Sequence, residues 1–414
     1  MTLIKKKHSN FILYLLGHNT SILGDIILMT GFALYIMKKT GSTMQFSITI
    51  AISFIPRILI SPYAGVIVDR LNKKKMVILL DLIRGLWLMV LWYISLHAQL
   101  SIQSIYITLI FFSVCDCFFG PAFSTIYPRI VHKDFLSKGN AISNTITSIT
   151  NTLSPLVASL IYTGWGLSIL LLFDAMTFII SAFTEFNLYF EDVIVKKTGK
   201  IFFEFKEGIM MIKSNRRLRS LLLNGNLTHL FLFPFIEAGV VFLLFVMFKA
   251  PDVHYGIVRS CISGGAIFSG FIAIQYQKKK GIADNINRGI IWMIGAVALF
   301  MLLIFNGFRD ILDTTEYFPV IYLSIVCFMV FFAFSFYGVF FRSFYQSEVS
   351  STMLGRFISI MIMTFAVSRL VGMLVYGYLL EKGYLTTALV ILFVGMMLKL
   401  VVHIPFLKAE KALD

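Results

Sequence analysis

Long apolar segments alternate along the chain with short polar ones. A membrane-spanning helix needs about 20 largely apolar residues. The stretches of that length are 11–37, 45–68, 77–97, 104–131, 140–163, 167–189, 220–248, 253–276, 289–307, 319–345, 354–380 and 385–406. Turn-forming residues separate them, as in Lys39–Ser42 and Lys249–Asp252. The pattern therefore predicts an all-α membrane protein with twelve transmembrane helices.

Composition supports this prediction. The chain is 58% hydrophobic and 14% charged, with a mean hydropathy of +0.85. A water-soluble protein cannot bury so much apolar surface and keep a polar exterior. The net charge of +15 does not indicate nucleic-acid binding, because the basic residues lie in the gaps between apolar segments. All four cysteines lie inside apolar segments, so we expect neither a disulfide nor a metal site.

Lysine and arginine are unevenly distributed between alternate gaps. One set of gaps holds clusters such as Lys5–Lys7, Lys73–Lys75 and Lys278–Lys280. The other set holds only Lys38, Lys39, Lys249, Arg309 and Lys382. Basic residues favour the cytoplasmic side of a membrane, and the ratio here is roughly five to one. We therefore expect a multi-pass cell-membrane protein with both its N- and C-termini in the cytoplasm.

The longest polar segment predicts the domain organisation. Within residues 190–219, Phe202, Phe205, Ile209 and Ile212 recur at helical spacing. This is typical of an amphipathic helix on the inner membrane surface. The segment predicts a cytoplasmic linker between an N-terminal six-helix bundle, 1–189, and a C-terminal one, 220–414. Two such halves around a central site are typical of secondary transporters.

Short motifs identify a family resemblance. One motif resembles the signature between the second and third helices of the major facilitator superfamily. It reads Gly65-x-x-x-Asp69-Arg70-x-x-Lys73-Lys74, with Asn72 where that signature usually has its second glycine. Four further segments are similar to the macrolide-efflux type of drug exporter within that superfamily: Thr40–Met44, Ser154-Pro155, Phe205–Gly208 and Leu354–Phe357. The resemblance implies two pseudo-symmetric six-helix bundles that work by alternating access.

The resemblance also implies a cytoplasmic gate. In the superfamily the acid of this signature lies against the cytoplasmic start of helix 11, which here is Leu354-Gly355-Arg356. A helix N-terminus carries partial positive charge, so it attracts a carboxylate. We expect Asp69 to latch onto that region. The gate residues implied by the resemblance are Gly65, Asp69, Arg70, Lys73, Gly355 and Arg356.

Three acidic residues lie deep in predicted helices: Asp25, Asp116 and Glu237. An ionised group at the centre of a membrane helix costs about 2.5–3.5 kcal/mol on insertion scales, so its presence indicates function. Burial raises the pKa of a carboxyl group and a nearby cation lowers it, as proton coupling requires. The resemblance places their helices, the first, fourth and seventh, at the transport cavity. The alternative is that each acid only pairs with a neighbouring arginine.

Three arginines, Arg57, Arg259 and Arg369, also lie within predicted spans. They are candidates for the substrate cavity, where structural pairing with a carboxylate and binding of an anionic substrate remain equally open. Phe336 and Tyr337, on the aromatic-rich tenth span, are candidates for its aromatic wall. Asp81 and Arg84 are three residues apart, so we interpret them as an i,i+3 salt bridge.

The sequence lacks the motifs of other function classes. It has no phosphate-binding Gly-x-x-x-x-Gly-Lys-Ser/Thr loop, and its histidines are not spaced as metal ligands. We expect no enzymatic activity, cofactor or metal. The prediction is a secondary active transporter, a proton-coupled exporter of a bulky small molecule, with an exporter of an anionic metabolite such as a carboxylate siderophore as the alternative. We expect a functional monomer in the lipid bilayer whose partners are the substrate and protons.

Overall fold

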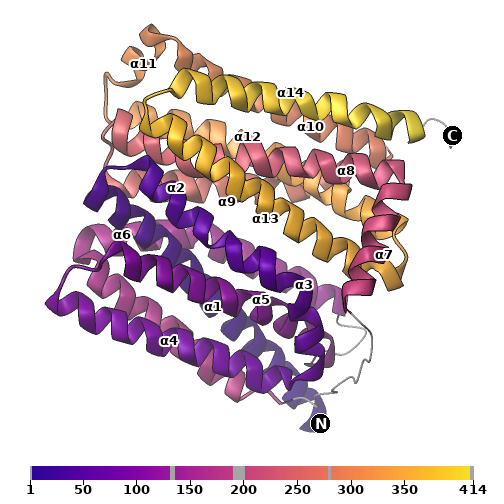
Figure 1. Cartoon of the computed structure of the whole chain (residues 1–414). Helices are drawn as coiled ribbons and strands as arrows, with labels where there is room; N and C mark the ends of the chain where they lie inside the picture. Colours follow the sequence, from indigo (N-terminus) through magenta and orange to yellow (C-terminus); the bar gives the residue numbers. More distant parts are fainter. Residues whose placement is uncertain (1, 131–135, 190–200, 278–280, 411–414) are drawn as a thin grey trace. The chain divides into compact units, whose positions relative to one another are not determined.

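The computed structural model describes residues 2–130, 136–189, 201–277 and 281–410, and the described part is helical without strands (Figure 1). The all-α prediction is therefore confirmed. The chain divides into two compact units. The N-terminal unit contains Met1–Lys38 and Leu59–Gly199, and the C-terminal unit contains Lys39–Ile58 and Lys200–Asp414. Each unit is described by itself below, and the boundaries of the domains 1–189 and 220–414 stay a prediction.

The N-terminal unit is built from five long helices. They are α1 (Thr2–Thr40), most of α3 (Phe54–Arg70), α4 (Lys73–His97), α5 (Ile102–Ile130) and α6 (Leu136–Phe186). The start of α4 has a local cause, because the side chain of Asn72 accepts a hydrogen bond of 2.9 Å from the N–H of Lys75. Asn72 thus serves as a helix cap at the position where the family signature usually has glycine.

Helix α6 accounts for two of the predicted spans. Among the described residues, eleven helical stretches are long and apolar enough to cross a membrane, and one of them, Thr145–Phe186, has 42 residues. At 1.5 Å per residue it is about 63 Å long, enough to cross a hydrocarbon core of about 30 Å twice. Gly166, with φ 77° and ψ −175°, interrupts the helical backbone. This break lies where the sequence predicts a turn between the spans 140–163 and 167–189.

Helix α1 packs closely on the second half of α6. Gly17, Gly24 and Gly31 recur every seven residues on α1. A side chain at any of the three would come within 2.6–2.8 Å of an α6 side chain, such as Thr177 at Gly24 or Leu170 at Gly31. Small residues let two membrane helices approach closely. This seven-residue glycine repeat therefore fixes α1 against α6.

The C-terminal unit holds the remaining elements. They are α2 (Thr43–Ile52), α7 (Ile201–Ser214), α8 (Arg216–Leu227), η2 (Thr228–Leu232), η3 (Phe235–Gly239), η4 (Phe242–Met247), α9 (Asp252–Gln277), α10 (Ile282–Phe300), η5 (Met301–Ile304), α11 (Asn306–Leu312), α12 (Tyr317–Glu348), α13 (Ser351–Glu381) and α14 (Leu385–Glu410). The predicted span 45–68 is divided at Ser53 between α2 and α3. Pro56 contributes to this break because it has no N–H to donate to the carbonyl of Ile52.

The predicted span 220–248 begins as α8 and continues through the π-helical segments η2, η3 and η4. The N–H of Phe248 donates to the carbonyl of Leu243 at 2.9 Å, the five-residue step of a π-helix. Pro234 lies between η2 and η3 and cannot donate a backbone hydrogen bond. π-Helical turns are rare and often occur at functional sites. Glu237 lies in η3.

A helix, Ile201–Ser214, lies within the predicted linker, whereas 190–200 lie outside the described residues. Its predicted amphipathic role on the inner membrane surface stays a prediction. Gly208 of this helix, α7, lies against Ile360 and Arg356 of α13. Glu207 forms an ion pair with Arg356. Helix α7 is therefore attached to the C-terminal unit by packing and by charge.

An arginine joins three helix ends of the C-terminal unit. Arg217, at the start of α8, lies 2.6 Å from Glu348 at the end of α12 and 3.0 Å from Glu410 at the end of α14. Asn215 caps α8 and also donates to Glu348 at 2.8 Å. A planar guanidinium can bind two carboxylates at once. This contact holds the ends of α8, α12 and α14 together.

The glycine pair Gly264-Gly265 on α9 provides a test of helix packing. A methyl group at Gly265 would collide with the backbone carbonyl of Phe328 on α12 and lie 3.0 Å from the N–H nitrogen of Phe332. At Gly264 the nearest atom, on the Phe328 ring, is 3.8 Å away. We expect Gly265→Ala to destabilise the protein by about 1–3 kcal/mol. Gly264→Ala should leave stability unchanged or slightly raised, since alanine favours helix.

Thermal unfolding of the two purified variants in one detergent measures this difference. Equal unfolding temperatures for the two variants would contradict the close contact between α9 and α12.

Candidate functional site

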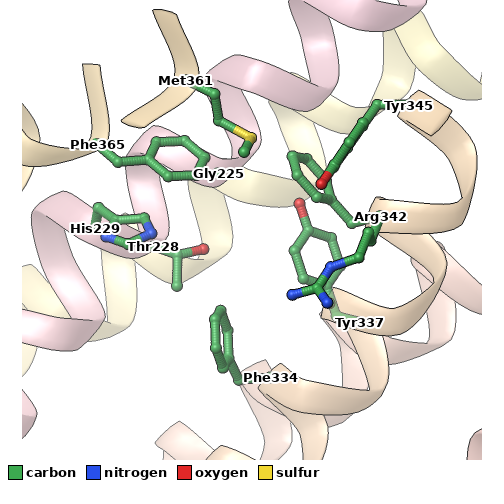
Figure 2. A pocket seen from close by; sticks show the side chains of 11 residues that line it. Gly225, Thr228, His229, Phe334, Tyr337, Arg342, Tyr345, Met361 and Phe365 are labelled. Atoms are coloured by element: carbon green, nitrogen blue, oxygen red, sulfur yellow. The ribbon is translucent and has the colours of Figure 1, made fainter. Parts of the chain in front are cut away.

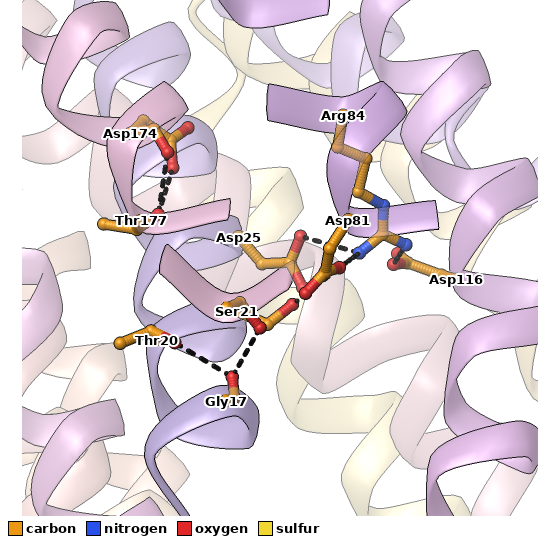
Figure 3. Close-up of polar contacts among 10 residues, drawn as sticks. Gly17, Thr20, Ser21, Asp25, Asp81, Arg84, Asp116, Asp174 and Thr177 are labelled. Atoms are coloured by element: carbon orange, nitrogen blue, oxygen red, sulfur yellow. Dashed lines mark hydrogen bonds and ion pairs between the residues drawn. The ribbon is translucent and has the colours of Figure 1, made fainter. Parts of the chain in front are cut away.

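Arg84 is the centre of a buried charge cluster in the N-terminal unit. Its Nη2 donates to Oδ1 of Asp116 on α5 at 2.6 Å. Its Nη1 lies 3.8 Å from Asp81 on the same helix and 3.9 Å from Asp25 on α1. Figure 3 shows the three carboxyl groups converging on the guanidinium. The Arg84 cluster, defined as Arg84 with Asp25, Asp81 and Asp116, thus joins three helices through one cation.

Aromatic rings surround the Arg84 guanidinium. Its central carbon lies 5.3–5.6 Å from the ring centres of Phe112, Phe119 and Phe178. Aromatic faces attract cations, and they also exclude water from the space around them. Arg84 and Asp81 are wholly buried. The geometry therefore holds a permanent positive charge inside an apolar region.

The cluster is accessible from one side. The side chains of Asp25 and Asp116 are 37% and 30% exposed, whereas those of Asp81 and Arg84 are fully buried. The Ser21 hydroxyl donates to Oδ1 of Asp81 at 3.3 Å. Two carboxyl groups of the cluster are thus partly exposed, and the third is held inside.

Helix α6 adds two further buried acids near the α1 contact. Asp174 accepts a hydrogen bond of 3.3 Å from the Thr177 hydroxyl, and its side chain lies against Gly24. Glu185 is also fully buried. Within the described residues no basic side chain forms a salt bridge with either acid.

In the C-terminal unit, Glu237 and Arg369 form an ion pair. Arg369 Nη2 donates to one carboxyl oxygen, and Nε lies 3.3 Å from the other. The guanidinium carbon lies 4.6 Å from the ring centre of Phe233 and 5.3 Å from that of Phe54. The sequence analysis assigned Glu237 to proton coupling and Arg369 to the substrate cavity. The structure brings them together. This is the arrangement expected under the alternative, in which each acid only pairs with a neighbouring arginine.

A cavity of about 170 Å³ opens in the same unit (Figure 2). Its lining side chains come from the α8–η2 helix, α12 and α13 and are mostly aromatic. The lining residues are Gly225, Thr228, His229, Phe334, Tyr337, Gly338, Phe341, Arg342, Tyr345, Met361 and Phe365. Tyr337 lines this cavity, and its expected role at the substrate cavity stays a prediction.

Phe336 lies elsewhere. Its side chain is fully buried. The ring packs against Trp292, with centres 4.7 Å apart, and against Tyr276 and Phe340. The structure therefore places Phe336 in helix packing around α12 and not among the lining residues of this cavity.

The remaining candidate arginines are separate from this cavity. Arg57 is half-buried, and its guanidinium carbon lies 5.9 Å from the ring centre of Phe54. Arg259 is half-buried on α9, and no salt bridge of Arg259 is found among the described residues. Their predicted role at the substrate cavity stays a prediction.

The predicted cytoplasmic gate is only partly described. The side chains of Gly65, Asp69 and Arg70 lie outside the described residues. Lys73 is buried at the start of α4, and Gly355 has open space beside it. The latch would join residues of two separately described units, so it stays a prediction.

Sequence reasoning overlooked Arg84. The predicted i,i+3 contact with Asp81 is present, but the closer partner of Arg84 is Asp116, on another helix. The available signal was the position of Arg84 midway along α4, far from either helix end. A permanently charged residue at that depth requires carboxylates from neighbouring helices. Arg342 and His229 were also missed, because nothing in the sequence places them beside a cavity.

Replacing Arg84 tests whether it is the common partner of the three acids. Arg84→Gln leaves Asp81 and Asp116 without their cation in a buried site, so we expect a loss of about 3 kcal/mol in stability. Arg84→Lys keeps the charge but not the fork-shaped group, and should lose less. Arg216→Gln is the control, because Arg216 is exposed at the start of α8. Thermal unfolding in detergent measures all three, and an unchanged Arg84→Gln variant would contradict the cluster.

Comparisons with known proteins extend these observations. The family model described as Major Facilitator Superfamily matches residues 14–373. Macrolide efflux protein A of Streptococcus pyogenes is 26% identical over 349 residues, which are 83% of this chain and 82% of that protein. Macrolide efflux protein A of Enterococcus faecalis is 25% identical over 325 residues, 77% of this chain and 96% of that protein.

Among solved structures, the fold resembles a bacterial homologue of the iron transporter ferroportin in an inward-facing state. The TM-score is 0.76 at 14% sequence identity, with 98% of this chain and 99% of that chain covered. At this identity the likeness concerns the fold alone. The chain therefore belongs to the Major Facilitator Superfamily and has its all-α fold of twelve transmembrane helices.

Proposed function

We propose that the protein is a proton-coupled exporter of a bulky small molecule that works by alternating access. The observation that carries this proposal is the Arg84 cluster, in which Asp25 and Asp116 are partly exposed inside membrane helices. Membership of a transporter family supports the transport function. The similarity to macrolide efflux proteins of two bacteria supports the outward direction and a bulky substrate.

The charges of the cluster suggest how a proton is used. Arginine stays protonated in proteins, so Arg84 supplies one fixed positive charge to three carboxyl groups. This excess of acids gives the cluster capacity to bind a proton. Arg84 lies 2.6 Å from Asp116 but 3.9 Å from Asp25. In the proposed cycle, proton uptake at Asp25 or Asp116 changes the pairing of Arg84 and thereby the contact between α1, α4 and α5.

In the C-terminal unit, the ion pair of Glu237 and Arg369 has the role that the Arg84 cluster has in the N-terminal unit. In the proposed cycle, Asp25 and Glu237 take up protons as the substrate is released outward, and they lose them when the cavity opens inward. Protonation of Glu237 removes the negative charge that Arg369 binds. The alternative, an anionic metabolite held by Arg57 and Arg369, requires the substrate to replace Glu237 as the partner of Arg369.

The energy of proton movement is sufficient for export. One charge that crosses a membrane potential of 100 mV releases about 2.3 kcal/mol. At about 1.4 kcal/mol per tenfold change in concentration, this sustains a substrate gradient of roughly fifty-fold.

Replacing the partly exposed acids tests the coupling. Asp25→Asn and Asp116→Asn keep the side-chain size but cannot release a proton. In proteoliposomes with an imposed pH gradient, we expect each to reduce gradient-driven erythromycin transport at least tenfold. Asp313→Asn is the control, because Asp313 is exposed in the segment between α11 and α12. Gradient-driven transport that both variants retain in full would exclude this cluster from coupling.

We further propose that both termini lie in the cytoplasm. The distribution of lysine and arginine supports this orientation. It predicts that a cysteine at Lys382, between α13 and α14, faces outward, whereas one at Lys213, at the end of α7, faces inward. Among the natural cysteines, Cys115, Cys117 and Cys327 are buried and Cys261 is half-buried, so background labelling should be low.

Labelling of intact cells with a membrane-impermeant maleimide checks the orientation. We expect Lys382→Cys to react in intact cells and Lys213→Cys only after permeabilisation. The reverse pattern would show that the orientation is inverted.

A further inference from the structure

The cavity of the C-terminal unit combines an aromatic wall with basic and hydrogen-bonding groups. Five of its lining side chains are aromatic rings of phenylalanine or tyrosine: Phe334, Tyr337, Phe341, Tyr345 and Phe365. His229 stacks on Phe365, with ring centres 4.2 Å apart. Its volume of about 170 Å³ is close to that of engineered cavities, about 150 Å³, that bind benzene. The cavity therefore has room for one aromatic ring of a larger molecule.

The charged group at the cavity is Arg342. It projects from α12 among the lining side chains (Figure 2). Within the described part of the chain, no salt bridge engages this arginine. None of the eleven lining residues is acidic. The cavity thus presents the guanidinium fork of an exposed arginine, with no acidic side chain among its described lining residues.

A buried hydroxyl group also lies in the wall of this cavity, on Tyr337 of α12. Tyr337 is 2% exposed, and within the described residues its hydroxyl has no hydrogen-bond partner. Buried tyrosine hydroxyls normally find a partner. Figure 2 shows this side chain in the wall of the cavity. A ligand oxygen in the cavity would supply the missing acceptor.

Lys399 of α14 contacts two of the residues that form this wall, Thr228 and Tyr337. It is fully buried, and its amino group donates to the carbonyl of Asn224 at 3.1 Å and to the Thr228 hydroxyl. The nitrogen lies 4.7 Å from the ring centre of Tyr337. Among the described residues Lys399 has no salt bridge with a carboxylate. It therefore positions two lining residues and places a further basic group beside the cavity.

We propose that this cavity, the Arg342 pocket, binds the end of the transported molecule that carries an aromatic ring and a carboxylate. The guanidinium of Arg342 matches a carboxylate in a bidentate geometry. The Tyr337 hydroxyl donates a further hydrogen bond, and the aromatic side chains enclose the apolar part of the ligand. This assignment rests on the proposed function as an exporter and names one class of its substrates, amphiphilic aromatic acids.

Other ligand classes fit the pocket less well. A cation would meet the guanidinium of Arg342, with no acidic side chain among the lining residues. A metal ion would find His229 alone, and the described residues contain no group of three potential metal ligands. The charge of the pocket therefore favours an anionic ligand.

A matched set of probes tests the ligand charge. Isothermal titration calorimetry with the full protein in nanodiscs compares phenylacetate, its neutral amide phenylacetamide and 2-phenylethylamine at pH 7.5. We expect the acid to bind at least tenfold more tightly than the amide and the amine to bind most weakly. An amide or an amine that binds as tightly as the acid would overturn the proposal.

Two variants locate the binding. Arg342→Gln should weaken binding of the acid at least tenfold and that of the amide less than twofold. Arg216→Gln, which removes an exposed arginine of the same unit outside the pocket, should leave both unchanged. Tyr337→Phe keeps the ring and should weaken binding of the acid several-fold. Equal losses for acid and amide in Arg342→Gln would assign that residue a structural role and overturn the proposal.

Transport measurements separate this proposal from the proposed function. If the acid binds through Arg342 but neither the acid nor erythromycin moves with protons in proteoliposomes, the pocket stands and coupled export fails. If erythromycin moves with protons while the acid shows no Arg342-dependent binding, coupled export stands and the pocket assignment fails.

Discussion

Hydrocarbon solvates ions poorly, so a charge that lies inside the membrane is stabilised when a group on another helix compensates it. Arg84 on α4 obtains it from acids on α1 and α5, and Arg369 on α13 obtains it from Glu237. Each arrangement also surrounds the guanidinium with phenylalanine rings. In each unit, the contact between one arginine and its acidic partners therefore helps to fix the relative positions of the helices that carry them.

Such contacts require helices to approach closely, and glycine makes this possible. The glycine repeat of α1 lets that helix lie directly on α6, which brings Gly24, the neighbour of Asp25, against the side chain of Asp174. In the C-terminal unit, Gly289 of α10 lies against the backbone of Tyr337, and Gly265 of α9 lies against that of Phe328. Helix α12 is thus held by two neighbours, and this fixes the side chains that it directs into the Arg342 pocket.

Much of the fold was predictable from the sequence, because a membrane span needs about 20 largely apolar residues and must satisfy its own backbone hydrogen bonds. The turn at Gly166 and the helix within the linker were both expected from local residues. The site was less predictable. Depth in the bilayer identified Asp25, Asp116 and Glu237 as unusual, but a linear sequence does not reveal which charges face each other. Arg84 looked like a partner of Asp81 because a helix brings those two together locally.

The same limit applies to the aromatic residues of α12. Phe336 and Tyr337 are adjacent in sequence, but they point in different directions on the helix. Phe336 packs against Trp292, whereas Tyr337 lines the pocket. Composition cannot separate such neighbours, because each aromatic residue is equally suited to lipid, to helix packing and to a ligand. The way in which α12 crosses α9 and α10 decides which of its aromatic residues packs between helices and which lines the pocket.

The π-helical segments have a consequence for the Glu237–Arg369 contact. Each π turn contains more residues than an α turn, so it rotates everything that follows about the helix axis. The beginning of this helix is anchored by Arg217 and by Asn224, which donates to the carbonyl of Lys399 at 2.9 Å. Removing the one extra residue that a π turn holds before η3 would turn Glu237 by about 100°, the rotation per residue of an α-helix. The ion pair therefore depends on the backbone register of this helix as much as on its two side chains.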